Sequence, residues 1–365
     1  MGFRCGIVGL PNVGKSTIFN ALTAAGIDAE NYPFCTIEPN VGIVPVLDKR
    51  LDILSDIAKT RKTIHTQMEF VDIAGLVKGA SKGEGLGNQF LGHIRQVDAI
   101  VHVVRCFEDD NIVHVDGGID PVRDRDVITT ELILSDLDTV EKRLKTTQSK
   151  AKSGDKTFIA QAACLDGLQK VLNDGNIARI YKPTSELEEK LIAEMCLLTT
   201  KPVLYVANVN EDDVIEGNAH VRALEAEAVK EQAGVVVIAG SIEQELSQLD
   251  AEEQAEFLAD MGMETSGLSR LVKAGYALLG LQTYFTVGEK ETRAWTIPVG
   301  ASAPQAAGKI HTDFEHGFIR AEVISYDDFV QCKGESKAKE QGLMRVEGKD
   351  YIVADGECMH FRFNV

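Results

Sequence analysis

The sequence lacks the features that would direct it to a membrane or to an oxidising compartment. None of its apolar runs approaches the roughly 20 residues needed to span a bilayer, although hydrophobic residues make up 44% of the 365-residue chain. The short apolar start MGFRCGIVGLP runs directly into a glycine-containing loop motif, which is typical of a first strand and not of a signal peptide. The seven cysteines form no Cys-x-x-Cys pair, which favours free thiols over bridges or zinc. We therefore expect a cytoplasmic protein without a membrane partner.

Positive charge is also scarce, with 38 Lys and Arg against 56 Asp and Glu and a formal net charge of -18. Broad nucleic-acid binding needs a basic face, so we expect no DNA binding and, at most, a local RNA contact. One basic run, EKRLKTTQSKAKSGDK, stands out in this acidic chain. It is either such an RNA contact or the solvated face of a helix. Its cations are Lys142, Arg143, Lys145, Lys150, Lys152 and Lys156.

Strand and helix patterns divide the chain into three regions. Apolar runs such as FRCGIVGL, TQMEFVDIA, AIVHVVRC, KPVLYVANV and VVVIAG alternate with helical stretches, which predicts an α/β domain with a mostly parallel sheet. We assign residues 1–129 and 200–280 to this domain. Residues 130–199 show leucine-spaced, charge-rich patterns without strand signals, which predicts an inserted antiparallel helical hairpin. Residues 281–365 form a separate small domain, expected to be mostly β with little helix.

The strongest motif is a phosphate-binding loop, Gly9-x4-Gly14-Lys15-Ser16, with a strand pattern before it and a helix pattern after it. Glycines let backbone N–H groups crowd around phosphate oxygens, and the helix N-terminus adds positive potential. Lys15 would reach the β and γ phosphates of a nucleoside triphosphate, and the Ser16 hydroxyl would ligate Mg²⁺. The sequence therefore predicts a P-loop nucleotide site.

Two further segments fit a nucleotide switch. In Asp72-Ile73-Ala74-Gly75, at the end of a strand, Asp72 would hold Mg²⁺ through water and the Gly75 amide would bind the γ phosphate. Alone, this motif is also ordinary turn chemistry. Thr36, in NYPFCTIEPNVGIV, would close on Mg²⁺ and the γ phosphate as part of a loop ordered by the triphosphate. Without its neighbours it would be an exposed loop threonine.

Base recognition is expected at Asn208-Val209-Asn210-Glu211, where switch GTPases place Asn-Lys-x-Asp. Guanine offers two adjacent donors, which one short carboxylate can accept together, whereas adenine offers one acceptor and one donor. Glu211 carries its carboxylate one methylene further out, and Val209 replaces the lysine that packs on guanine. Asn208 and backbone groups can meet the mixed adenine pattern. The alternative is that Glu211 is only a solvated residue.

The motifs GLPNVGKST, NYPFCTIEPNVG, DIAGLVKGAS and GEGLGN, the Asn-x-x-Glu and the tail RAWTIPVGASAPQAAGKIHTDFEHGFIRAEV together resemble the Obg-like ATPase family over essentially the whole chain. The resemblance implies a preference for ATP, a coiled-coil insertion, a C-terminal ubiquitin-like α+β domain of the TGS type and association with the ribosome. It also implies roles for particular residues. Phosphate contacts would come from Asn12, Val13, Gly14, Lys15, Ser16 and Thr17, Mg²⁺ contacts from Ser16 and Thr36, and base contacts from Asn208, Val209 and Glu211.

The hydrolytic machinery is the least determined part of the sequence. Many switch GTPases place a water-orienting Gln after the Gly of Asp-x-x-Gly, but Leu76 stands there and cannot orient water, so slow turnover is expected. Asn12 is a candidate for holding K⁺ beside the phosphates. His114, in a loop after an expected strand, is a candidate catalytic residue or a surface histidine.

Three functional interpretations stay open at this point. The first is a switch protein that binds and slowly hydrolyses ATP, with a weaker preference for GTP, and associates with the ribosome. The second is a ribosome-binding module gated by ATP, in which hydrolysis is incidental. The third is a GTPase of the Obg group.

Overall fold

The computed structural model describes residues 3–25, 40–73, 86–109, 111–112 and 117–364, except for the side chains of 86–88. Two compact units share these residues. Unit 1 comprises residues 1–44 and 69–275, and unit 2 comprises residues 45–68 and 276–365. Within the described ranges, no helix combines the length and apolar character that crossing a membrane requires.

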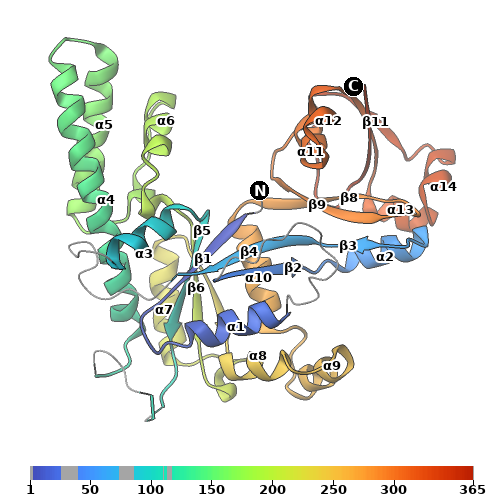
Figure 1. Cartoon of the computed structure of the whole chain (residues 1–365), viewed down its shortest axis with the longest axis horizontal. Coiled ribbons are helices and arrows are strands. Elements are labelled where there is room, and N and C mark those ends of the chain that lie inside the picture. Colours follow the sequence, from blue (N-terminus) through green and yellow to red (C-terminus); the bar gives the residue numbers. More distant parts are fainter. Residues whose placement is uncertain (1–2, 26–39, 74–85, 110, 113–116, 365) are drawn as a thin grey trace. The chain divides into compact units, whose positions relative to one another are not determined.

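Unit 1 is built on a six-stranded sheet with the order β2-β4-β1-β5-β6-β7 (Figure 1). The ladders β4-β1, β1-β5, β5-β6 and β6-β7 are all parallel, which confirms the mostly parallel α/β sheet. Its strands are β1 (Arg4–Val8), β2 (Val41–Val46), β4 (Thr66–Asp72), β5 (Ala99–Arg105), β6 (Val203–Asn208) and β7 (Gly234–Ile238). The helices that surround it are α1 (Lys15–Ala25), α3 (Leu86–Arg95), α7 (Ala219–Lys230), α8 (Gly240–Leu246), α9 (Ala251–Asp260) and α10 (Gly267–Leu278).

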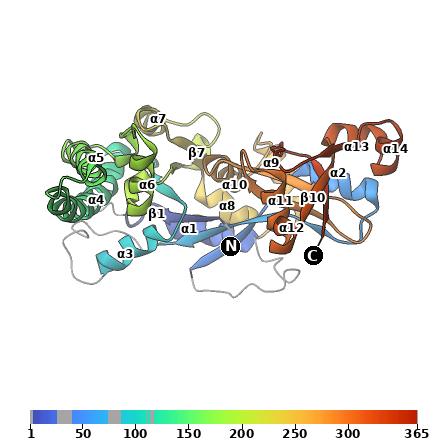
Figure 2. The ribbon, with the colours of Figure 1, turned by 90° about the horizontal axis from the view of Figure 1, so that it is seen from above.

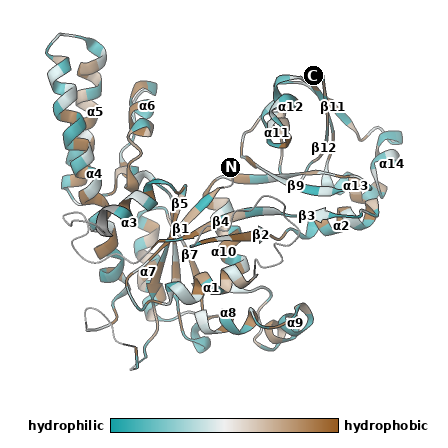
Figure 3. Ribbon diagram, viewed as in Figure 1, coloured by the Kyte–Doolittle hydropathy of each residue, from teal (hydrophilic) through white to brown (hydrophobic). Residues whose placement is uncertain are grey.

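The central strands form the interior of unit 1 because both of their faces are covered. Every residue of β5 is buried, and the last five residues of β6 are buried as well. Such strands appear as continuous apolar runs rather than as alternating patterns, and they are drawn in brown in Figure 3. The β-rich runs of the sequence therefore mark β1, β4, β5, β6 and β7 correctly. Strand β2 was not predicted from the sequence.

A helical arm interrupts the sheet between β5 and β6. It contains α4 (Pro121–Ala151), α5 (Lys156–Asn173) and α6 (Glu186–Met195), with the short 3₁₀ helices η2 (Ala178–Ile180) and η3 (Leu198–Thr200). Figures 1 and 2 show α4 and α5 side by side, and a buried cluster of Val140, Leu144, Leu165 and Leu168 lies between them. The expected helical insertion is therefore present.

Helix α4 begins at Pro121, before residue 130, where the insertion is expected to start. Asp120 caps α4 by accepting hydrogen bonds from the N–H groups of Val122 and Arg123, both at 3.1 Å. Pro121 occupies the first turn, where its missing N–H costs nothing. The first part of α4 packs on β5 and α7, so this helix belongs partly to the sheet layer and only later becomes the arm.

Unit 2 contains a second six-stranded sheet, with the order β11-β10-β12-β8-β9-β3. Its strands are β3 (Thr63–Ile64), β8 (Leu281–Thr286), β9 (Thr292–Pro298), β10 (Phe318–Ile324), β11 (Arg345–Glu347) and β12 (Cys358–Phe363). Its helices are α2 (Lys49–Ala58), α11 (Ala303–Ile310), α12 (Thr312–His316), α13 (Tyr326–Cys332) and α14 (Glu335–Glu340). The expectation of little helix in residues 281–365 is therefore wrong, because four short helices accompany the strands there.

Unit 2 also contains residues that were expected to belong to the P-loop domain. Residues 45–68 supply α2 and β3, and β3 pairs with β9 in parallel. Leu51 and Leu54 of α2 are fully buried in a cluster with Phe285 and Phe329. The apolar face of α2 thus needs the C-terminal strands to cover it, which a boundary drawn from local patterns does not reveal.

Candidate functional site

A cavity of about 840 Å³ lies over the N-terminus of α1, within unit 1. Four segments line it: the loop after β1, the segment after β5, the end of β6 with the residues that follow it, and the residues after β7. Ligands of open α/β sheets bind at this edge, outside the carboxyl ends of the strands. The cavity is large enough for a nucleotide, since small-molecule sites typically measure about 300–1,000 Å³.

The loop after β1 has the backbone conformation of a phosphate cradle. Asn12 and Gly14 adopt positive φ angles of 64° and 88°. A Cβ atom at Gly14 would lie 2.1 Å from Nδ2 of Asn208, so only glycine fits both the conformation and the space. The C=O of Gly14 accepts from the N–H of Ile18 at 3.0 Å, and α1 starts at Lys15. The free N–H groups of its first turn therefore face the cavity floor.

Lys15 and Asp72 form an ion pair beside this loop. Their side chains are 11% and 19% exposed, so Asp72 at the end of β4 lies next to the phosphate cradle, as the sequence predicts. The Ser16 hydroxyl lies on the first turn of α1 and lines the cavity. A hydroxyl and a carboxylate are hard oxygen donors that suit Mg²⁺, which usually keeps several waters and takes phosphate oxygens as further ligands. The residues present therefore fit a Mg²⁺–nucleotide complex.

Asn208 ties two walls of the cavity together. Its Nδ2 donates to the C=O of Val13 at 2.9 Å, and its Oδ1 accepts from the N–H of Gly240 at 3.0 Å. The side chain is buried, so both ends of the carboxamide are engaged inside the protein. The residue thus holds the P-loop against the start of α8. Asn208 also lines the cavity and its Nδ2 has a second N–H, so a contact with the base stays a prediction.

The residues after Asn208 divide between the cavity and the solvent. Val209 and Asn210 line the cavity together with Gly240, Ser241 and Gln244, and the Val209 N–H donates to the C=O of Ile238 at 2.9 Å. Glu211 is exposed at the start of the 3₁₀ helix η4 (Glu211–Asp213), and it is not among the described lining residues. The contribution of Ser241 and Gln244 was not anticipated, because α8 follows β7 some 30 residues further along the chain.

The segment after β5 is held by one buried arginine. Arg105 is 1% exposed and donates to three carbonyl oxygens, those of Phe107, Asp109 and Ile112, at 3.1, 3.2 and 3.0 Å. Its guanidinium also lies 4.6 Å from the ring centroid of Phe107. The three residues whose carbonyls it binds are the ones that line the cavity from this side. Arg105 was not predicted as a site residue, although a charged residue at the end of an apolar strand was a visible signal.

Several predicted residues lie outside the described part of the chain. These are Thr36, Gly75, Leu76 and His114. Val13 is buried with a 1% exposed side chain, and Asn12, Gly14, Lys15, Ser16 and Thr17 all line the cavity. The structure therefore brings together the phosphate-loop residues, Asp72, Asn208 and Val209.

Family models match both ends of the chain. A model described as "50S ribosome-binding GTPase" matches residues 4–152. A second model, of the YchF GTPase C-terminal domain and described as "Protein of unknown function (DUF933)", matches residues 281–364. The first covers the P-loop and part of the arm, and the second covers most of unit 2.

Full-length relatives extend the match over the whole chain. The ribosome-binding ATPase YchF of Escherichia coli O157:H7 is 58% identical over 365 residues, and that of Bacillus subtilis is 53% identical over 367 residues, each with complete coverage of both chains. The solved structure of the Schizosaccharomyces pombe YchF GTPase superposes with a TM-score of 0.90 at 36% identity, covering 99% of this chain and 98% of that one. With a P-loop cavity in unit 1 and these relatives along its entire length, the chain belongs to the YchF family.

Proposed function

We propose that this chain is a nucleotide-dependent switch that binds and slowly hydrolyses ATP and associates with the ribosome in the cytoplasm. The observation that carries the proposal is the cavity over α1, with its P-loop glycine, Lys15 and Asp72 in position. The bacterial relatives that match the full chain are named ribosome-binding ATPases, which supports the same activity and partner here.

The proposed chemistry is positioning and charge stabilisation. The first-turn N–H groups of α1 and the Lys15 ammonium would hold the phosphates and spread the charge that develops on the transferred phosphoryl group. Bound Mg²⁺ would neutralise phosphate charge, with Ser16 and Thr36 as ligands and Asp72 acting through water. The Gly75 amide would contact the γ phosphate, and Asn12 is the proposed K⁺ ligand. His114 stays a candidate catalytic residue.

Base selection is proposed to depend on the wall that follows β6. The Asn208 carboxamide is positioned by Val13 and Gly240, and its second Nδ2–H would contact the base together with the backbone at Val209 and Asn210. Glu211 would complete this wall in the nucleotide complex. A preference for ATP over GTP follows from the longer carboxylate and from the apolar Val209 in place of lysine.

A second candidate is a GTPase of the same fold. It is favoured by the descriptions of the matching family model and of the fission yeast relative, which both name GTPases. A third is an ATP-gated binding module with incidental hydrolysis, which Leu76 favours because an apolar side chain cannot orient water.

The arm is the proposed ribosomal RNA contact. Of the basic run, Lys142 pairs with Asp138 at 2.6 Å and Arg143 lies 3.6 Å from Glu194. Lys145 and Lys150 lie on one surface of α4 with Thr146 and Ser149 around a shallow hollow. Hydroxyl and ammonium donors together suit phosphate oxygens.

The test of the proposed activity is steady-state nucleotide turnover with and without purified ribosomes. A regulatory ATPase should hydrolyse ATP faster when ribosomes are added. If ribosomes bind in an ATP-dependent manner but leave turnover unchanged, the gated module is the better description. Faster hydrolysis of GTP than of ATP would favour the GTPase.

A further inference from the structure

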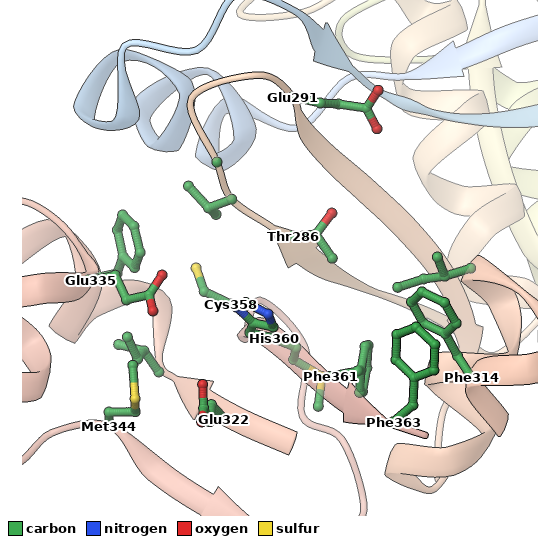
Figure 4. Close-up of a pocket in the computed structure, with 16 residues that line it drawn as sticks. Thr286, Glu291, Phe314, Glu322, Glu335, Met344, Cys358, His360, Phe361 and Phe363 are labelled. Carbon is green, nitrogen blue, oxygen red and sulfur yellow. The ribbon is translucent and has the colours of Figure 1, made fainter. Parts of the chain in front are cut away.

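Unit 2 contains a cavity of about 340 Å³ that the nucleotide site does not use. It lies between β12 and residues 286–291, which comprise the last residue of β8 and the loop after it (Figure 4). Buried Phe361 and Met359 contribute to its lining, and Phe314 and Phe363 stack at one end with ring centroids 3.7 Å apart.

The cavity adjoins an open strand edge. Among the described residues, the parallel ladder between β8 and β12 has the single register position Cys358↔Phe285. β8 ends one residue later at Thr286, whereas β12 continues to Phe363. Beyond this position, β12 therefore extends without β8 beside it.

The backbone groups of β12 alternate between its two neighbours. The C=O of Glu357 accepts from the N–H of Phe285 at 2.8 Å, so residue 357 directs its backbone toward β8. Every second residue shares that direction, which places the peptide groups of Phe361 and Phe363 on the open side. An unpaired strand edge is a template for an added strand.

The cavity is also lined by side chains from both faces of the sheet, as an added strand requires. Ile310 and Phe314 pack with one core cluster of unit 2, and Phe329 and Met344 pack with the other, yet all four line the cavity. Successive side chains of a strand point to opposite faces. A segment lying along β12 would therefore place one apolar side chain in each direction.

The negative charge of the residues that line the cavity favours a positively charged ligand. Glu291, Glu322 and Glu335 line the cavity, and its described lining contains no Lys or Arg. Arg362 Nη2 lies 3.0 Å from Glu322 Oε2 and holds the pKa of that carboxyl below its usual range, so Glu322 is ionised. Glu291 and Glu335 are exposed; Glu291 Oε1 lies 4.0 Å from Arg293 Nη1, and His360 also lines the cavity. These carboxylates disfavour a phosphate-bearing ligand and favour cations.

We propose that this cavity binds an extended basic segment of a partner protein, which adds as a strand to the open edge of β12. Apolar side chains of the segment pack on the two faces of the gap, and its Lys or Arg side chains reach Glu291 and Glu335. The proposal is independent of the identity of the nucleotide.

The test uses the full chain and a fluorescent peptide of alternating lysine and valine, about eight residues long so that it exceeds the open edge at roughly 3.3 Å per residue. Binding is followed by fluorescence anisotropy. The double variant Glu291→Lys/Glu335→Lys should weaken binding at least tenfold. Its matched control, Glu289→Lys/Glu340→Lys, makes the same charge change at exposed glutamates of the same two segments that do not line the cavity, and should bind within twofold of the unmodified chain. Thermal melts confirm that both variants are folded.

A backbone measurement separates strand addition from charge attraction alone. Peptide binding should slow amide hydrogen exchange in Met359–Phe363, and a peptide N-methylated at alternate residues should bind at least tenfold more weakly. The proposal is overturned if both double variants lose affinity equally, if N-methylation has no effect, or if an alternating glutamate-valine peptide or a short RNA binds as well as the basic peptide.

Discussion

At the scale of single residues, Asn208 links the two halves of the nucleotide cavity. Its carboxamide satisfies the C=O of Val13 and the N–H of Gly240, which are separated by more than two hundred residues in the chain. Because these groups are buried, removing their partner leaves them without a hydrogen bond.

The variant Asn208→Ala should therefore lose both stability and nucleotide binding. We expect the free energy of unfolding to fall by about 1–3 kcal/mol, the cost of leaving buried polar groups unsatisfied, and nucleotide affinity to fall at least tenfold. Urea denaturation and nucleotide titration measure the two effects. Asn210→Ala is the stability control, because Asn210 is exposed and makes one long bond of 3.4 Å to the C=O of Glu108. Equal stability of the two variants would contradict this role.

His102 of β5 should make stability depend on pH. Burial first, and then the charge of Arg125, lowers its pKa from 6.5 to about 3. In the unfolded chain, His102 binds a proton as the pH falls below about 6.5, whereas in the folded chain it stays neutral until about pH 3. The free energy of unfolding is therefore highest above pH 6.5 and declines as the pH falls toward 3. The slope contributed is up to about 1.4 kcal/mol per pH unit.

Urea denaturation of the His102→Gln variant between pH 7 and pH 5 isolates this contribution. The unmodified chain should lose stability more steeply than the variant over this range, whereas His316→Gln, at an exposed histidine, should keep the full slope. Burial raises the pKa of carboxyl groups such as Asp136 and Glu243. These groups contribute equally to the pH dependence of all three proteins, so the difference between the curves reports on His102. Parallel curves for His102→Gln and the unmodified chain would show that His102 does not titrate in this way.

Residue identities were easier to predict than residue roles. Gly9, Gly14, Lys15 and Ser16 form a motif within eight residues, so sequence alone locates the phosphate site. Asn208 was also found, but its role depends on Val13 and Gly240, which only the folded sheet brings to it. Neither Ser241 nor Gln244 carries a local signal of cavity lining.

At the scale of elements, the segment after β5 depends on Arg105. A buried guanidinium that binds three carbonyls fixes the conformation of the residues that line the cavity. Arg105→Gln should lower the free energy of unfolding by at least about 1.5 kcal/mol, because one hydrogen bond to a charged group contributes about 1.5–3 kcal/mol. It should also speed amide hydrogen exchange around residues 107–112 and weaken nucleotide binding.

The half-exposed Arg123 provides the matched control for that experiment. Its side chain is 37% exposed and contacts Asp124 and the C=O of Gly118. Arg123→Gln should change stability by less than Arg105→Gln and leave exchange in residues 107–112 unaltered. If Arg105→Gln leaves exchange in that segment unchanged as well, Arg105 does not organise the cavity wall.

Elements with one clear hydrophobic periodicity were predicted well. Elements whose apolar face is covered by residues far away in the sequence were not. The buried strands β5 and β6 are continuous apolar runs and were identified directly. The helical insertion was expected to start at 130, whereas the capping pair Asp120 and Pro121 marks the start of α4. The helices of unit 2 are short, so their patterns are weak, and α2 finds its cover in β8 and α13.

At the scale of the whole molecule, the arm and the nucleotide unit are proposed to act together on the ribosome. Charge reversal of Lys145 and Lys150 to glutamate should reduce ribosome co-sedimentation about tenfold, equivalent to roughly 1.4 kcal/mol, and the loss should be greatest at low salt. Reversal of the exposed Lys170 and Lys182, which lie outside the basic run, is the control and should have little effect. Equal co-sedimentation of the two double variants would count against an arm contact.

The central claim is that this P-loop cavity prefers ATP, and its most direct test is titration of the nucleotide-free chain with non-hydrolysable ATP and GTP analogues in Mg²⁺, with and without K⁺. We predict that the ATP analogue binds at least tenfold more tightly, roughly 1.4 kcal/mol, and that Glu211→Asp narrows the difference. Equal or tighter binding of the GTP analogue would contradict the account, and the residues after β6 would then not select adenine.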